Sequence, residues 1–121
     1  MSEGRLTAVR GAITVGEDSK EAIHAGTAEL LVTLFERNGL GAEDLVSIIF
    51  TATPDLTADF PAVAARELGL GQVPLLCAQE IPVGGAISRC IRVLVHCYPD
   101  PEQAIHHVYL REARQLRPDL D

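Results

Sequence analysis

The chain has 121 residues, 47% of them hydrophobic, and a formal net charge of −7. This length predicts one domain, residues 1–121, with a single core. The negative charge argues against nucleic acid and membrane surfaces as partners, and no apolar run is long enough to cross a bilayer. The beginning of the chain lacks the apolar stretch of a signal peptide, and the three cysteines lack C-x-x-C spacing. We therefore expect a cytoplasmic protein with reduced thiols and no metal site.

The first predicted element is a strand over residues 6–15, interrupted by Arg10 and Gly11. A cation inside an apolar strand is costly unless an anion meets it. Gly11 permits a bulge or a close approach to the backbone.

A helix is predicted next. Asp18, with Glu21 three residues later, has the spacing of a capping box. Apolar residues then recur at helical spacing until Gly39, which ends the helix. His24 lies off the apolar line, so we interpret it as a solvated surface residue.

Residues 45–52 are almost continuously apolar, which is typical of a strand covered on both faces. A loop follows, and Phe60-Pro61 opens a short helix that Gly69 ends. Phe60 either packs as a core residue at the helix entrance or covers a pocket.

The central stretch joins two strands. One apolar run leads to Glu80, another surrounds Arg92, and between them Pro82, Gly84 and Gly85 break regular structure. Arg92 either lies on the solvated face of a half-exposed strand or is held at a site for an anionic ligand. Periodicity alone leaves both interpretations open.

Residues 91–98 predict the last long strand, residues 104–109 a further strand, and residues 110–116 a short helical turn. The order strand, helix, strand, helix, strand, strand predicts an α+β domain, a small mixed sheet with helices on one face. A small sheet has edges to hide, and a closed oligomer would hide them.

Common catalytic motifs are missing from the sequence. It has no Gly-rich phosphate loop, no metal-ligand spacing and no nucleophile elbow. His106 and His107 are adjacent, so in a strand they face opposite ways and make a poor metal pair.

Eight pieces in order, over nearly the whole chain, carry a family resemblance. They are V-R-G-A-I-T-V (9–15), T-A-T-P-D-L (51–56), F-P-A-x-A-A-R-E-L (60–68), V-P-L-L-C-A-Q-E (73–80), G-G (84–85), C-I-R-V (90–93), H-V-Y-L (107–110) and L-R-P-D-L (116–120). With these pieces the chain resembles the AroH-type chorismate mutases, the trimeric and mostly non-helical class.

The resemblance implies a homotrimeric pseudo-α/β-barrel with active sites at the subunit interfaces. It also implies the [3,3] rearrangement of chorismate to prephenate in phenylalanine and tyrosine biosynthesis. That reaction uses no cofactor or metal.

The resemblance also implies roles for individual residues. Arg10 matches an arginine that binds a substrate carboxylate, and Tyr109 a tyrosine that orients the other carboxylate. Arg92 matches the arginine at the ether oxygen of the breaking bond. Glu80 matches the carboxylate that accepts a hydrogen bond from the ring hydroxyl, with Cys77 beside it. The implied pocket walls and entrance are Phe60, Arg66, Leu76, Leu116 and Arg117.

Two positions depart from the family pattern: Leu76 stands where some relatives have a hydroxyl residue, and His106 stands where arginine is common. Structural alternatives also stay open. Arg10 and Glu80 could form a plain cross-strand ion pair, and Cys77 could be a small buried hydrophobe.

Tyr109 could be an aromatic residue of a subunit interface. Arg66 and Arg117 could be surface residues.

The alternative function is a trimeric module that binds a small carboxylate metabolite without converting it. A third candidate is an imine deaminase of similar design.

Overall fold

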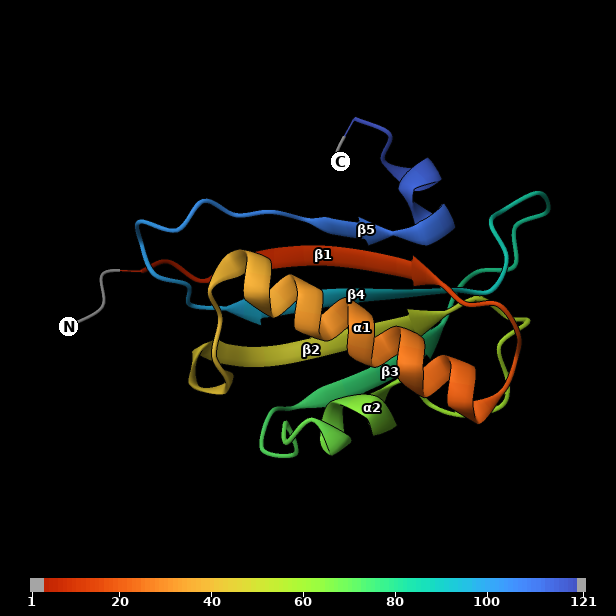
Figure 1. The fold of residues 1–121 in the computed structure, drawn as a ribbon, viewed down its shortest axis with the longest axis horizontal. Helices are drawn as coiled ribbons and strands as arrows, with labels where there is room; N and C mark the ends of the chain where they lie inside the picture. Colours follow the sequence, from red (N-terminus) through yellow and green to blue (C-terminus); the bar gives the residue numbers. More distant parts are fainter. Residues whose placement is uncertain (1–3, 120–121) are drawn as a thin grey trace.

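Residues 4–119, which the computed structural model describes, form a five-stranded mixed sheet with two α-helices on one of its faces (Figure 1). The strand order is β3-β2-β4-β1-β5, in which the β1–β4 and β2–β4 pairs are antiparallel and the β1–β5 and β2–β3 pairs are parallel. The elements are β1 (Thr7–Thr14), α1 (Lys20–Asn38), the 3-10 helix η1 (Ala42–Asp44), β2 (Leu45–Ala52), α2 (Ala62–Glu67), β3 (Leu75–Gln79), β4 (Cys90–Cys97), β5 (Val108–Leu110) and the 3-10 helix η2 (Arg111–Leu116). The predicted small mixed sheet with few helices is therefore confirmed.

Helix α1 begins one residue later than predicted. Ser19 is the N-cap, and its hydroxyl oxygen accepts a hydrogen bond from the backbone N–H of Ala22 at 3.0 Å. The predicted capping box of Asp18 and Glu21 is wrong, because the Asp18 carboxylate instead binds the loop after β2.

The end of α1 matches the prediction and also fixes the approach to β5. Gly39 has a φ of 61°, the left-handed conformation that closes a helix. The buried Asn38 donates through Nδ2 to the carbonyl oxygens of Leu34 and His106, and its Oδ1 accepts from the His106 backbone N–H at 2.7 Å. Asn38 thus binds both the carbonyl oxygen and the N–H of His106. Strand β5 therefore forms only from Val108 onward and is shorter than the strand predicted over residues 104–109.

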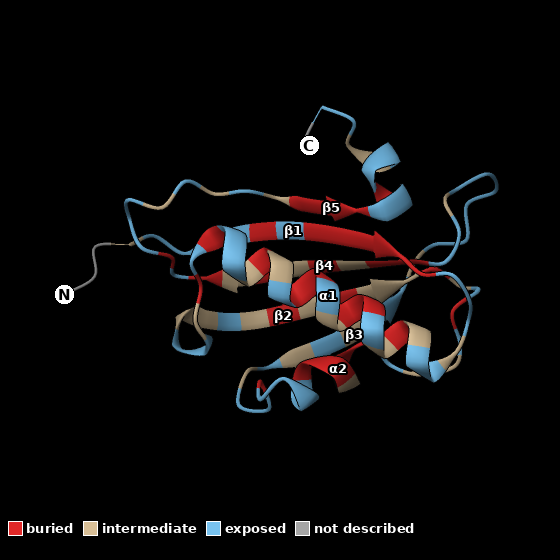
Figure 2. Cartoon of the chain, in the orientation of Figure 1, coloured by how far each residue is buried: buried red, intermediate tan, exposed pale blue. Residues whose placement is uncertain are grey.

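The hydrophobic core lies between the sheet and the helices, and alternate residues of the strands contribute to it. Figure 2 colours the buried positions red. Its largest fully buried side chains include Phe50, Ile13, Ile23, Leu30, Leu31, Leu34, Ile48 and Ile91. The opposite face of β2 carries no helix in the single chain, so Ile49 and Thr51 stay half-buried. The expectation that residues 45–52 are covered on both faces is therefore wrong for the single chain.

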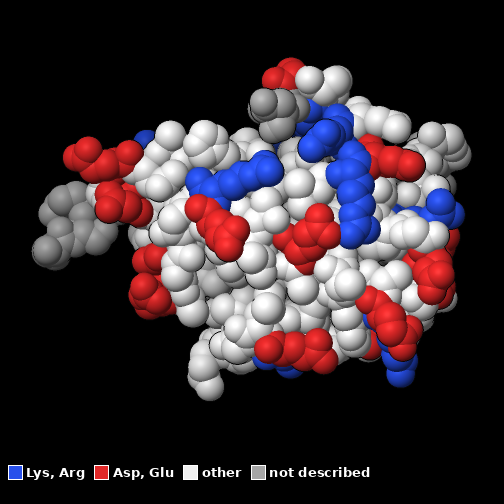
Figure 3. All heavy atoms as spheres, viewed as in Figure 1, with Lys and Arg blue, Asp and Glu red and all other residues white. Residues whose placement is uncertain are grey.

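Charges on the face that carries α1 are mixed. Basic side chains lie next to acidic ones near the C-terminal segment (Figure 3), and Arg111 of η2 forms an ion pair with Glu29 of α1 at 2.6 Å. Within residues 4–119, neither α-helix combines the length and apolar character needed to cross a bilayer.

Candidate active site

Strand register brings one row of side chains together on the sheet face opposite the two α-helices. Arg92 of β4 pairs with Thr51 of β2 on one side and with Ala12 of β1 on the other. Ala12 in turn pairs with Tyr109 of β5. Cross-strand partners point to the same face of a sheet, and the neighbours of Arg92 in sequence, Ile91 and Val93, point into the core. Ala12 is fully buried, in a small cluster with Tyr109 and with Ala113 of η2.

Glu80 reaches the row from the end of β3. Its backbone N–H donates to the carbonyl oxygen of Ala52 at 2.9 Å, which extends the ladder by one bond. Its carboxylate Oε2 accepts a hydrogen bond from the Thr51 hydroxyl and lies 2.9 Å from Nε of Arg92. Both contacts use Oε2. Oε1 has no hydrogen bond to any residue between 4 and 119, so it is free to accept one from a ligand.

The Arg92–Glu80 contact is an ion pair and not an aligned hydrogen bond. Nε of Arg92 is buried and has no acceptor in hydrogen-bonding geometry among the described residues, although Oε2 is only 2.9 Å away. The side chain as a whole is 41% exposed, so its accessible part lies elsewhere on the side chain. Buried donors without an aligned acceptor are rare, and a functional role is one recognised reason for them.

A cavity of about 430 Å³ lies against this row. Its wall includes Arg10, Thr51, Glu80, Arg92 and Tyr109. The structure thus brings together the four residues predicted to be catalytic. The ion pair of Glu80 is with Arg92 and not with Arg10, so the alternative of a plain Arg10–Glu80 pair is wrong.

The start of β4 is fixed by the loop after β2. The Thr53 hydroxyl accepts from the backbone N–H of Cys90 at 3.0 Å and donates to Asp55 at 2.6 Å. Asp55 accepts from the backbone N–H of Arg89 at 2.9 Å. Arg89 has a φ of 48°, which is uncommon for a residue with a side chain. These bonds hold the backbone just before Arg92 and so restrict where its guanidinium can lie.

Phe60 and Cys77 line a different cavity, of about 470 Å³, together with Lys20 and Asp59. Phe60 is 65% exposed. It is therefore a pocket residue and not a core residue at the helix entrance.

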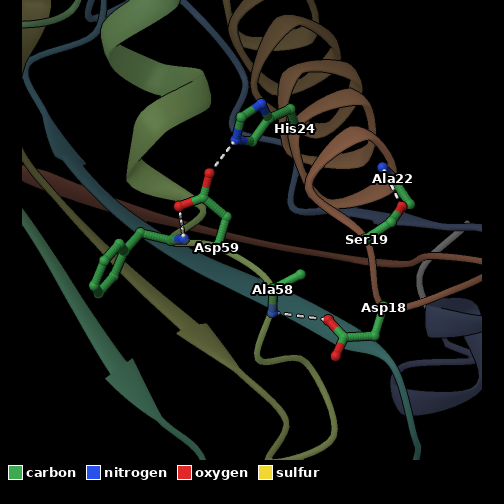
Figure 4. A network of polar contacts seen from close by, with 7 residues as sticks. Asp18, Ser19, Ala22, His24, Ala58 and Asp59 are labelled. Carbon is green, nitrogen blue, oxygen red and sulfur yellow. Dashed lines mark hydrogen bonds and ion pairs between the residues drawn. The ribbon is translucent and has the colours of Figure 1, made fainter.

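A polar network holds the segment around Phe60 (Figure 4). Asp18 accepts from the backbone N–H of Ala58 at 3.0 Å, and Asp59 accepts from the backbone N–H of Phe60 at 2.8 Å. Asp59 also pairs with Nε2 of His24 at 2.8 Å. The Phe60 N–H, and after it the His24 ring, lower the pKa of Asp59. The interpretation of His24 as a solvated surface residue is therefore wrong: it ties α1 to the loop before α2.

The remaining predicted pocket residues are dispersed. Leu76 and Arg66 are exposed and line neither of the two cavities described above. Leu116 packs against the small buried cluster that contains Tyr109. Arg117 forms an ion pair with Asp119 at 2.8 Å. Asp119, with a smaller contribution from Tyr109, raises the pKa of Arg117.

The three cysteines are unpaired. Burial raises the pKa of Cys97, and it raises the pKa of Cys90 to about 11. Both thiols therefore stay protonated near neutral pH and are poor nucleophiles. Over the part of the chain that is described, no three His, Cys, Asp or Glu residues are grouped so that they could hold a metal ion.

Sequence reasoning missed Thr51 as a partner of Glu80. The two residues are 29 positions apart, and only the register of β2 against β3 and β4 makes them neighbours. The signal in the sequence was a threonine at alternating spacing in an apolar strand, and this signal does not indicate which residue the threonine contacts.

Fold and site together define a small α+β protein with a cavity suited to an anion. The model of the family described as chorismate mutase type I matches residues 6–120. Chorismate mutase AroH of Thermus thermophilus is 55% identical over 115 residues, covering 93% of this chain and 94% of that protein. Chorismate mutase AroH of Bacillus subtilis is 45% identical over 117 residues, covering 95% and 92%. A solved structure of chorismate mutase from Clostridium thermocellum matches with a TM-score of 0.85 and 44% identity, covering 90% of this chain and 98% of that one. The chain belongs to the chorismate mutase type I family.

Proposed function

We propose that the chain catalyses the [3,3] rearrangement of chorismate to prephenate in phenylalanine and tyrosine biosynthesis. One observation carries the proposal: a single cavity has two arginines, a carboxylate and a phenol in its wall, in a chain that belongs to a chorismate mutase family. The reaction breaks one C–O bond and forms one C–C bond within one molecule. No proton, electron or group leaves the substrate, so positioning and electrostatics suffice.

Arg10 and Tyr109 are the proposed ligands of the two substrate carboxylates. Chorismate is a dianion, and it reacts only in a compact conformation in which its two reacting carbons meet. Groups that fix both carboxylates select that conformation. The proposal is supported by the placement of both residues at the wall of one cavity, on the neighbouring strands β1 and β5.

Arg92 is the proposed stabiliser of the transition state. Negative charge grows on the ether oxygen as its bond breaks, and a fixed cation there favours the transition state over the ground state. Arginine suits this role because it keeps its charge at all physiological pH values. Glu80, through its free Oε1, is the proposed acceptor for the ring hydroxyl and not a general base.

The magnitudes fit this division of roles. A millionfold acceleration corresponds to about 8 kcal/mol. One preorganised donor at a developing oxyanion contributes about 3–4 kcal/mol, and positioning can supply the remainder.

The proposal includes a homotrimer with active sites between subunits. On the face opposite the two α-helices, η2 packs against Ala12 and Tyr109, whereas Leu76 of β3 is 61% exposed and Ile81 in the β3–β4 connection is 81% exposed. Phe60 and Cys77 line a different cavity from Arg92 in the same chain. A site shared between chains would explain this separation if one subunit presents Phe60 to the Arg92 cavity of the next. Arg66, Leu76, Leu116 and Arg117 would complete its walls and entrance.

A cytoplasmic location is also part of the proposal. The three unpaired cysteines support it, because free thiols are typical of reducing compartments.

The test adds chorismate to the purified protein, follows its loss by ultraviolet absorbance and identifies the product. We expect conversion to prephenate far above the rate without protein. Binding of chorismate without conversion would overturn the proposal in favour of a module that only captures a carboxylate metabolite.

A further inference from the structure

His107 contacts the backbone of Arg10. The backbone N–H of Arg10 donates to Nδ1 of the His107 ring at 3.0 Å. Strand β5 pairs with β1 from Gly11 and Val108 onward, so Arg10 and His107 stand one position before the first ladder pair. At this point Asn38 binds the backbone of His106. The contact with β1 is therefore continued by the side chain of His107.

The contact requires a neutral imidazole with its proton on Nε2. A backbone N–H can only donate, so Nδ1 must be the accepting nitrogen. Burial lowers the pKa of His107, and the nearby cations Arg10, on β1, and Arg117, after η2, lower it further. Tyr109 is the next residue with its side chain on the same side of β5, and Asp119 is paired with Arg117. The ring is therefore held neutral at pH 7 and can accept.

We propose that His107 is a positioning residue for Arg10: it fixes the backbone of β1 at the point from which the Arg10 guanidinium enters the cavity. This rests on the proposed function, in which Arg10 binds a substrate carboxylate. Arg10 is exposed on β1 and carries a long side chain with considerable rotamer freedom. Fixing its backbone reduces the ordering that substrate binding must impose.

A carboxylate ligand holds the substrate in the ground state and in the transition state alike. Loosening the backbone of Arg10 weakens this contact without removing it, so KM rises, while substrate that is bound still adopts the reactive conformation and kcat stays nearly unchanged. A single neutral hydrogen bond is worth about 0.5–1.5 kcal/mol, so KM should rise about two- to tenfold.

Two substitutions at His107 and one matched control test the proposal. His107→Leu removes the acceptor. His107→Asn retains one, because its amide oxygen lies close to where Nδ1 lies. His106→Leu is the control, since His106 is the exposed neighbour and contacts Asn38 through its backbone alone. We expect a higher KM for His107→Leu, and wild-type values for His107→Asn and for the control.

A second readout does not depend on activity. Hydrogen exchange at the Arg10 backbone N–H, measured by NMR, should accelerate in His107→Leu but not in His107→Asn or His106→Leu. If His107→Leu does not fold, His107→Gln replaces it, because its oxygen lies nearer the position of Nε2.

The outcomes separate this inference from the proposed function. A wild-type protein that does not convert chorismate overturns the proposed function, while the exchange measurement still decides whether His107 holds Arg10. Conversion of chorismate with an unchanged KM in His107→Leu overturns the positioning role alone. An equal rise of KM in His107→Leu and His106→Leu also overturns it, because the effect would not come from the acceptor.

Discussion

At Arg92, charge and geometry are set before any ligand binds. Its Nε lies 2.9 Å from Glu80, and the backbone ahead of it is held by Thr53 and Asp55. We predict that Arg92→Ala lowers kcat for chorismate by about 100- to 1,000-fold, the usual effect of removing one donor from a developing oxyanion. The oligomer should remain intact by light scattering.

Arg37→Ala is the matched control for that variant, because Arg37 is an exposed arginine at the end of α1. It should keep wild-type turnover. Turnover of Arg92→Ala within tenfold of the wild type would show that Arg92 is not the stabilising cation.

Glu80 has two separable properties, a negative charge toward Arg92 and a free acceptor oxygen. Glu80→Gln keeps the acceptor and loses the charge, whereas Glu80→Ala loses both. We predict that kcat/KM falls much less in Glu80→Gln than in Glu80→Ala, measured with chorismate under the same conditions. Equal losses would mean that accepting a hydrogen bond is not its role.

The titration of His107 predicts a pH dependence of stability. Its folded-state pKa lies below its ordinary value of 6.5, so the unfolded chain takes up the proton first as pH falls. The stabilisation from the neutral ring is present above pH 6.5 and is lost as pH falls through the lowered pKa. The free energy of unfolding of the wild type should therefore decline relative to that of His107→Asn below pH 6.5. A constant difference between the two across that range would contradict the prediction.

Residue-level patterns identified the charged side chains but not their partners. A lone arginine in an apolar strand predicts an anionic partner, and for Arg92 that partner is Glu80. Periodicity could not decide between a solvated arginine and a site residue. The family resemblance favours the site residue, and the structure adds the geometry, while the role of Arg92 stays a prediction. Thr51, Asp55 and His107 were missed because their partners come from other elements.

At the scale of elements, the N-cap of α1 differs between the prediction and the structure. Ser19 caps the helix through its hydroxyl. We predict that Ser19→Ala lowers the free energy of unfolding by about 1 kcal/mol, the usual cost of a lost N-cap. Chemical denaturation measures it.

Glu21→Ala is the comparison, since Glu21 is exposed in the first turn. Only a small loss is expected there, from the helix dipole. A larger loss in Glu21→Ala than in Ser19→Ala would restore the capping box that the sequence suggested.

Elements set by local chemistry were predicted well, and those set by distant contacts were not. The bounds of β2 and the end of α1 at Gly39 follow from an apolar run and a single glycine. Asp18 was misassigned because the loop it binds lies 39 residues further along the chain. The predicted strand over residues 104–109 was too long because Asn38 engages the backbone of His106.

For the whole molecule, the sheet face opposite the two α-helices carries the proposed subunit contacts. Ile49 lies on that face, and Val32 is an exposed residue of α1. We predict that Ile49→Glu lowers the mass in solution from three times the 13.0 kDa of one chain to a single chain. Val32→Glu should leave the trimer intact, and light scattering distinguishes the two. A trimer in both variants would place the subunit contacts elsewhere.

The candidate site is predictable only in part at this scale. The four residues predicted to be catalytic do share one cavity in one chain. Phe60 and Cys77 lie on another, and a sequence does not specify how two copies meet. Their contribution stays a prediction that depends on the proposed trimer.

The burial of the thiols has a practical consequence. Cys90 and Cys97 are buried, whereas Cys77 is half-exposed at the cavity that Phe60 lines. A maleimide dye added to the native protein therefore has one accessible attachment point per chain, without any engineered cysteine. Fluorescence from that point would report directly on what enters the space between Phe60 and β3.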